Sequence, residues 1–386
     1  MPPGILERLR DAPALRAVAG EPGVWVVGGA VRDALLGLEP RELDLVVEGD
    51  AIAVGRRAAE RAGGELTAHE RFGTATVRAG ALELDLASAR RERYVAPGAL
   101  PEVELGASIE EDLARRDFSV NAIAVALDDG RVASVPHALE DLDRRLLRVL
   151  HDRSFADDPT RLLRMARYAA RLGFAAEAHT AALAVAADLA GVSGERLGAE
   201  LRLLLREPQP AALAALERLA PAVLPGLAVD PARTEAALAA TPADARRDLV
   251  ALASAWAPDD ERLRALGFPA ADRRILAAAG RAAQLRDALD AATRPSEVRR
   301  VLDREPVEAA ALAGGEHARR WIAEWRHVRP ALSGADLLAA GMRGPALGAA
   351  LDAATDALLD GRAPDRESQL AVALASGAAP PPRPPA

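Results

Sequence analysis

The 386-residue sequence contains no cysteine and no lysine. Without cysteine the chain can form no disulfide, no zinc–thiolate site and no thiol nucleophile. Because all 49 basic residues are arginine, any side-chain cation that holds a phosphate must be a planar guanidinium, which can bind two oxygens at once. Aromatic residues make up only 3% of the chain. Half of the residues are apolar, many of them Ala and Leu, and this composition favours helices.

Long apolar runs are also absent. No stretch of about eighteen apolar residues lacks a charge, so we expect no membrane-spanning helix and no membrane partner. The first ten residues are charged and have no apolar core, which argues against a secretory signal, and we expect a cytoplasmic protein. The net charge of −8 argues against non-specific coating of nucleic acid but leaves room for a local basic groove.

Residues 24–36 have the pattern of a strand, a glycine turn and a short helix. Gly28 and Gly29 at the start of that helix leave backbone N–H groups free. These groups, the positive end of the helix dipole and Arg32 one turn later predict a phosphate site. A glycine pair between strand and helix is more often only a turn, and both interpretations stay open here. A dinucleotide-binding turn is disfavoured, because the third glycine of G-x-G-x-x-G is missing.

Carboxylates follow on the next predicted strands. Glu42 and Asp44 lie two residues apart, so their side chains point to the same face of a strand. The later strand 82–87 carries Glu83 and Asp85, of which Asp85 lies nearer the strand's end and is the better candidate for a third ligand. Such carboxylates are usually solvated surface, but clustered they bind divalent metal ions. A metal site beside a phosphate site predicts nucleotidyl transfer.

The other patterns predict a mixed first part and a helical remainder. Residues 90–105, with two prolines and a glycine among charges, predict a long functional loop. A capping box at Ser108 and Glu111 predicts the start of a helix. From His137 onwards the strand signals stop, and we expect helices nearly to the end. Further helix and strand patterns occupy residues 51–62 (helix) and 65–68, 74–78 and 122–126 (strands).

A helix rich in arginine is predicted after residue 157. Asp158 can act as its N-cap, with Pro159 at the first helical position. Four arginines follow with no acid between them: Arg161, Arg164, Arg167 and Arg171. A solvated helix and an anion-binding helix are both compatible with this pattern.

Taken in order, these segments resemble the bacterial tRNA nucleotidyltransferase/poly(A) polymerase family of the DNA polymerase β-like nucleotidyltransferase superfamily. The matching segments cover about residues 22–206 and include VGGAVRD, ELDLVVEGDA, LELDLAS, EEDLARRDFSVNAIA and FADDPTRLLRMARYAARLGF. The resemblance implies an α+β head with a small mixed sheet, followed by an all-α neck, body and tail. We expect a catalytic head at 1–145, a neck at 146–215, a tRNA-binding body and tail at 216–376, and a disordered terminus at 377–386.

The resemblance also implies the role of each site residue. Glu42, Asp44 and Asp85 would be the catalytic carboxylates that hold two Mg²⁺ ions. Gly28, Gly29 and Arg32 would bind the incoming triphosphate. The other nucleotide-binding residues would be Arg115, Arg116, Asp117, Asn121, Asp158, Arg161 and Arg164.

Asp158 and Arg161 would choose the base. Cytosine and adenine both present an amino donor beside a bare ring nitrogen, so a carboxylate and an arginine can pair with either one. Uracil and guanine present the reverse pattern, and leaving buried polar groups unpaired can cost a factor of about 10⁴–10⁵. The resemblance therefore implies addition of C, A or CCA to the 3′ end of tRNA from CTP and ATP, without a nucleic-acid template.

Two positions depart from the family pattern. Glu42 stands where the family has Asp, and because its side chain is longer the metal geometry must adjust, which predicts reduced activity. Asp157 stands where the family has Glu, and we expect this change to be tolerated. With few aromatics, we expect arginine–phosphate contacts and shape recognition of RNA rather than base stacking.

Three alternatives to tRNA end addition stay open. A poly(A) polymerase shares all of these segments, although a full-length 90–105 segment favours A or CCA addition over addition of C alone. A non-catalytic RNA-binding relative would have a decayed metal site marked by Glu42. A helical scaffold with an incidental head fits only the C-terminal half.

Overall fold

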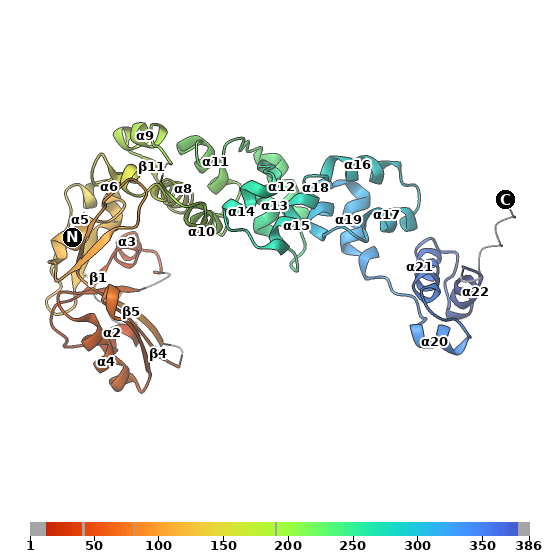
Figure 1. The fold of residues 1–386 in the computed structure, drawn as a ribbon, viewed down its shortest axis with the longest axis horizontal. Helices are drawn as coiled ribbons and strands as arrows, with labels where there is room; N and C mark the ends of the chain where they lie inside the picture. The colour runs from red at the N-terminus through yellow and green to blue at the C-terminus, as the bar shows by residue number, and fades with distance from the viewer. Residues whose placement is uncertain (1–12, 41–42, 81, 190, 377–386) are drawn as a thin grey trace. The chain divides into compact units, whose positions relative to one another are not determined.

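The computed structural model describes residues 13–40, 43–80, 82–189 and 191–376 (Figure 1). The chain divides into two units: residues 1–208 with 214–225, and residues 209–213 with 226–386. The expected head and neck thus fall mostly in the first unit, while the boundaries at 145 and 215 stay predictions. The expected metal ligand Glu42 and the terminus 377–386 lie outside the described residues.

A seven-stranded mixed sheet forms the centre of the first unit, within its described residues (Figure 1). Its order is β3-β4-β5-β2-β1-β8-β9, in which β2 and β5 are parallel and all other neighbours antiparallel. The strands are β1 Val24–Val27, β2 Asp44–Val47, β3 Glu65–His69, β4 Thr74–Ala79, β5 Leu82–Ser88, β8 Ile123–Ala126 and β9 Val132–Ser134. The predicted α+β head with a small mixed sheet is confirmed.

Helix α4 (Ala51–Ala62) covers one face of this sheet. The carboxylate of Asp50 caps its start by accepting from the backbone N–H groups of two residues in the first turn, and Gly63 ends it with a left-handed φ of 62°. Gly55 of α4 packs against Ala75 and Leu86 of the sheet so closely that an added Cβ would lie 3.0 Å from the Ala75 side chain. The small residues of α4 therefore allow close helix–sheet packing.

Helix α5 (Ile109–Ala114) covers the other face. Its residues Ile109 and Leu113 share an apolar core with Trp25, Val27 and Val46. The predicted capping box at the start of α5 is confirmed. Since alternate residues of a strand point to the same face, Asp44, two residues before Val46, also lies on the α5 side, just beyond the apolar core. Asp44 is the first residue of β2.

The expected long loop at 90–105 is wrong. Strands β6 (Arg90–Arg93) and β7 (Glu102–Leu105) pair antiparallel, which leaves only residues 94–101 as the hairpin tip. The charges that suggested a loop instead face one another across the hairpin, where the Arg93 guanidinium pairs with the Glu102 carboxylate. Opposite charges on neighbouring strands stabilise such a pair.

The chain after His137 is mainly helical, as predicted, with one exception. Two short strands, β10 (Leu146–Leu147) and β11 (Ala175–Ala176), pair in parallel. The remaining helices of residues 13–225 are α2 Pro13–Ala17, α3 Gly29–Leu35, η1 Glu70–Phe72, η2 Ser119–Asn121, α6 Ala138–Arg144, α7 Ser154–Asp157, α8 Arg161–Leu172, α9 Ala178–Val185, α10 Gly194–Leu204 and α11 Ala211–Leu219.

The predicted N-cap at Asp158 is wrong by two residues. Thr160 is the N-cap of α8, and Asp158 ends α7 with an extended backbone. The Asp158 carboxylate still caps locally, because it accepts from the backbone N–H of Thr160. The proline after Asp158 disfavours a helical backbone at the residue before it, which separates α7 from α8.

The described part of the second unit contains only helical elements. These are α12 Pro231–Ala240, α13 Arg247–Ala255, α14 Asp260–Ala265, α15 Ala270–Ala279, α16 Ala282–Ala291, α17 Pro295–Leu302, α18 Val307–Ala313, α19 Gly315–Ala323, η3 Trp325–His327, α20 Gly334–Ala339, α21 Ala346–Leu359 and α22 Arg366–Ser376. Their main core includes Val298, Leu302 and Trp321. None of the helices described in either unit is both long and apolar enough to span a bilayer.

Candidate functional site

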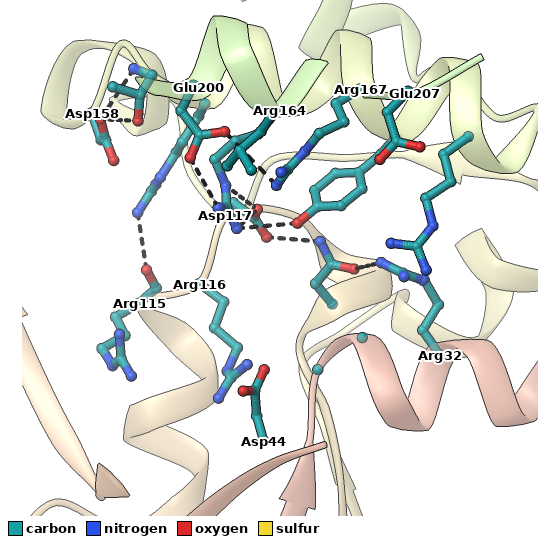
Figure 2. Close-up of a pocket in the computed structure, with 18 of the residues that line it drawn as sticks. Arg32, Asp44, Arg115, Arg116, Asp117, Asp158, Arg164, Arg167, Glu200 and Glu207 are labelled. Atoms are coloured by element: carbon teal, nitrogen blue, oxygen red, sulfur yellow. Dashed lines mark hydrogen bonds and ion pairs between the residues drawn. The ribbon is translucent and has the colours of Figure 1, made fainter. Parts of the chain in front are cut away.

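A polar cavity of ≈ 560 Å³ opens in the first unit, with its wall formed by residues from α3, β2, β6, η2, α8 and α10 and from the segments between them (Figure 2). Eleven of the thirteen predicted site residues line it: Gly28, Gly29, Arg32, Asp44, Arg115, Arg116, Asp117, Asn121, Asp158, Arg161 and Arg164. Asp85 lines an adjoining pocket of ≈ 340 Å³, which shares Asp44, Arg115 and Arg116 with the cavity. Residues predicted from four separate stretches of sequence therefore lie around one space.

Asp44 and Asp85 stand directly opposite each other in the parallel pair of β2 and β5. Both side chains are exposed, and both lie on the α5 side of the sheet. Asp85 accepts a hydrogen bond from the Thr76 hydroxyl at 2.5 Å. Glu83, the rejected alternative, pairs instead with Arg78 at 2.7 Å. The register thus places Asp85, rather than Glu83, beside Asp44.

The donor set of this pair suits a hard cation. Both groups offer carboxylate oxygens in solvent, and Mg²⁺ is commonly held by one or two carboxylates together with substrate phosphates. Across residues 13–40, 43–80, 82–189 and 191–376, no three histidine or acidic side chains gather as a metal site. The third expected ligand, Glu42, is outside those ranges, so Asp44 and Asp85 are the two expected ligands that the structure places.

Gly28 allows an arginine to approach the turn after β1. Its φ of 69° favours glycine, and a Cβ at this position would lie only 2.7 Å from Nη1 of Arg116. Arg116 donates to Asp112 through Nη2 at 3.1 Å, while its Nε is buried and has no hydrogen-bond partner among the described residues. The glycine turn therefore holds a guanidinium against the backbone at the cavity wall.

Arg32 lies in the wall with every nitrogen of its guanidinium engaged. Nε and Nη2 donate to Oδ1 of Asp33 at 2.8 and 2.7 Å, and Nη1 donates to Oδ1 of Asn121 at 2.5 Å. The residue is 1% exposed, and its guanidinium lies 5.3 Å from the centre of the Tyr168 ring. Arg32 thus reaches the cavity as a fixed, compensated cation.

Asp117 connects the head to helix α8. Its Oδ1 accepts from Asn121 Nδ2 at 3.0 Å, and its Oδ2 accepts from Arg164 Nε at 2.8 Å. Burial by itself would raise the pKa of Asp117, but the charge of Arg164 and the hydrogen bonds from Asn121 and Arg164 lower it to about 2. The Asp117 charge in turn raises the pKa of Arg164 well above its usual value. Both groups therefore stay charged at neutral pH.

The expected base-reading pair lies on the neck side of the cavity. Oδ1 of Asp158 accepts from the Thr160 hydroxyl at 2.7 Å and from Nη2 of Arg196 at 2.9 Å. Arg161 is 4% exposed and donates to the Ser154 hydroxyl at 2.6 Å through Nη1, and to the Arg115 carbonyl through Nη2. These bonds fix both groups beside the cavity.

The interpretation of α8 as a solvated arginine helix is wrong. Arg161, Arg164, Arg167 and Arg171 all line the cavity. They extend over the cavity side of α8 because helical residues three and four apart are neighbours on the helix surface. Tyr168 lies among them with its hydroxyl accepting from Arg164 Nη2 at 3.1 Å. A spacing of three and four residues indicates this shared face in the sequence, and it is found at Arg164, Arg167, Tyr168 and Arg171.

Other lining residues were missed for lack of any local pattern. Asp33 simply follows Arg32 in the sequence, and Glu200 is one of two acids in α10, with no pattern that distinguishes it. In the structure Glu200 lies between Arg164 and Arg167, at 3.5 and 3.8 Å from their guanidinium nitrogens. Only the packing of α10 beside α8 brings it there.

Comparison with known proteins shows which sequences and folds this chain resembles. Residues 24–148 match the poly(A) polymerase head domain family. Over 197 residues the chain is 47% identical to an A-adding tRNA nucleotidyltransferase of Halalkalibacterium halodurans, a match that covers 48% of this chain and 46% of that protein. Over 193 residues it is 45% identical to a CC-adding tRNA nucleotidyltransferase of Deinococcus radiodurans, covering 48% and 50%.

A solved apo structure of a CCA-adding enzyme has a TM-score of 0.76 with this chain at 28% identity, covering 92% of this chain and 91% of the other. The head of this chain thus belongs to the poly(A) polymerase head domain family, and the relatives that it matches are tRNA nucleotidyltransferases. The resemblance seen in the sequence is confirmed, and so is the family's fold of a mixed-sheet head followed by helices. The chain spans about half the length of the curated relatives of the family described above.

Proposed function

We propose that this chain is a template-independent RNA nucleotidyltransferase that adds C, A or both to the 3′ end of tRNA, from CTP and ATP with release of pyrophosphate. The observation that carries the proposal is the register pair Asp44 and Asp85 at the edge of an arginine-lined cavity. Eight arginines line that cavity: Arg32, Arg115, Arg116, Arg161, Arg164, Arg167, Arg171 and Arg206. Carboxylates for cations beside guanidiniums for phosphates suit a nucleoside triphosphate and an RNA end.

Asp44 and Asp85, together with Glu42, would hold Mg²⁺. The ion would supply charge neutralisation at the triphosphate and a lowered pKa of the RNA 3′-hydroxyl. All other contacts to the nucleotide would come from the chain's own residues. Arg116, with its unpartnered buried Nε and its Nη1 against the glycine turn, is placed to contact phosphate oxygens.

Base choice would rest on Asp158 and Arg161. Three donors occupy Oδ1 of Asp158, namely the Thr160 N–H and hydroxyl and the Arg196 guanidinium, and no described residue donates to Oδ2. That oxygen can accept from the amino group of C or A, while Arg161 can donate to the adjacent ring nitrogen. The fixed partners of both residues keep the pair in place without a template strand.

Incorporation assays with the purified full chain test this proposal. The acceptors are tRNAs that end before CCA, after one C and after CC, with an unrelated RNA as control, and labelled CTP or ATP is supplied with Mg²⁺. Addition only to the CC-ended tRNA identifies A addition, and addition to all three that stops at CCA identifies the complete activity. Long A tails on the control RNA would make the chain a poly(A) polymerase instead.

The Glu42→Asp variant extends the same assay. Restoring the family's usual carboxylate should raise incorporation if Glu42 limits metal binding. If neither the natural chain nor this variant incorporates nucleotide with Mg²⁺ or Mn²⁺, the enzymatic proposal is wrong and a non-catalytic RNA-binding role takes its place.

A further inference from the structure

Arg196, near the start of α10, joins two parts of the site that are far apart in sequence. Its Nη2 donates to Oδ1 of Asp158 at 2.9 Å, and its Nη1 donates to the carbonyl of Gly98 at 2.6 Å. Gly98 lies in the tip of the β6–β7 hairpin, 98 residues earlier in the chain. One planar guanidinium thus links the hairpin tip to the carboxylate that is proposed to read the base.

The first link determines which Asp158 oxygen is available. Thr160 supplies two donors to Oδ1, its N–H at 3.1 Å and its hydroxyl at 2.7 Å, and Arg196 supplies the third. The Thr160 contacts are local and neutral, so Arg196 provides the only charged donor to this carboxylate in the described chain. With Oδ1 occupied, a ligand's amino group meets Oδ2 in one orientation.

The second link fixes Arg196 itself. The hairpin tip is held on the neck independently, because the Gly98 N–H donates to the Ala156 carbonyl at 3.0 Å. Pro97 of the tip also lies close to Gly191, where an added Cβ would be 2.2 Å from the Pro97 carbonyl oxygen. The Gly98 carbonyl therefore offers a positioned acceptor that limits the rotation of the Arg196 guanidinium.

We propose that Arg196 is a positioning residue for base choice, which orients Asp158 toward amino-bearing bases and takes its own orientation from the hairpin tip. This inference rests on the proposed function. Without the guanidinium, only the two Thr160 contacts hold Oδ1, so the Asp158 carboxylate is less firmly oriented and its hydrogen bond to an amino group has a less fixed direction. The discrimination between C or A and U or G should then weaken, because it depends on that direction.

The test compares Arg196→Gln and Arg196→Lys with the natural full chain. The acceptor is CC-ended tRNA, and kcat/KM is measured separately for ATP, CTP, UTP and GTP. We expect the preference for the best nucleotide over UTP and GTP to fall about 10- to 100-fold in Arg196→Gln, the range for one hydrogen bond to a charged group. Arg196→Lys keeps the charge and should recover part of the preference.

Arg144→Gln is the matched control. Arg144 is also an arginine of the first unit that pairs with an acid, Glu140, but it is exposed and lies outside the cavity lining. The preference of the Arg144→Gln variant among the four nucleotides should equal that of the natural chain. If Arg196→Gln lowers kcat/KM equally for all four nucleotides, Arg196 is only structural and the inference is wrong.

Two further measurements separate this inference from the proposed function. Equilibrium binding of ATP and of GTP needs no turnover. The Kd for GTP divided by the Kd for ATP should fall in Arg196→Gln even if the chain adds no nucleotide. An unchanged ratio contradicts the role of Arg196, whatever the incorporation assays show. Cleavage by chymotrypsin after Tyr94 or Leu100 should also accelerate in Arg196→Gln, since the tip loses a neck contact, and an unchanged rate contradicts the hairpin link.

Discussion

Arg171 Nη2 donates to Oδ2 of Asp33 at 2.8 Å, across 138 residues of sequence. The other oxygen of Asp33 accepts from Arg32 through two nitrogens. One buried carboxylate therefore compensates two guanidiniums, one from the helix that follows β1 and one from α8. From Arg32 the hydrogen bonds continue through Asn121 and Asp117 to α8 again. The wall of the cavity is thus one connected ionic network.

Asp33→Asn should destabilise the fold by about 3–5 kcal/mol, because the Arg32 charge would be left buried without its partner. Both side chains of that pair are 2% exposed. The measurement is the free energy of unfolding from urea titration. Arg171→Gln should cost less, since the Arg171 side chain is 18% exposed and its loss leaves Arg32 paired. Equal effects of the two variants would contradict this ordering.

Gly28→Ala should weaken nucleotide binding, and Gly63→Ala should not. Both glycines have a left-handed φ, 69° and 62°, so each substitution should cost about 1 kcal/mol of backbone strain. Only at Gly28 would the added Cβ meet Arg116, whereas nothing lies within 4 Å at Gly63. We expect a higher KM for ATP in Gly28→Ala alone. If both variants change KM alike, backbone strain rather than Arg116 displacement is responsible.

Asp117 should make stability depend on pH in the acid range. Its pKa of about 2 in the folded chain lies below the ordinary value of 3.8, so its contribution is present above about pH 4 and is lost as the pH falls through 2. The contribution should be about 2 kcal/mol. Urea unfolding at several pH values between 5 and 2 should show the natural chain losing its advantage over Asp117→Asn. If the free energies of unfolding of the two proteins change in parallel with pH, Asp117 is not responsible for the pH dependence of stability.

Asp44→Asn and Asp85→Asn should each lower incorporation by more than about 100-fold, since even the partners of metal ligands matter by 10- to 100-fold. Mn²⁺ binding, measured by titration, should weaken in parallel, and removal of metal by EDTA should abolish incorporation. Glu83→Gln is the matched control, because Glu83 lies on the same strand and face as Asp85 but pairs with Arg78. A loss of metal binding in Glu83→Gln equal to that in Asp85→Asn would contradict the choice of Asp85.

Local patterns predicted much of the head correctly. The apolar run 24–27, the capped helix at 51–62 and the alternating strand 82–87 each fold as their sequences indicate, because the deciding interactions are between near neighbours. The hairpin β6–β7 was missed because its charges resemble a loop, and only cross-strand pairing explains them. The helix start after Asp158 was misplaced by two residues, within the uncertainty of helix ends read from sequence.

The sequence by itself determined the strand–turn–helix start, the order of the family's segments and eleven of the residues that line the site. It could do so because alternation on a strand and spacing on a helix are local properties of the chain. Only the tertiary structure decided which groups meet: Asp44 opposite Asp85, Arg171 on Asp33, and Arg196 between Asp158 and Gly98. These contacts join residues far apart in sequence, and their partners are fixed by the packing of sheet, hairpin and helices rather than by any local pattern.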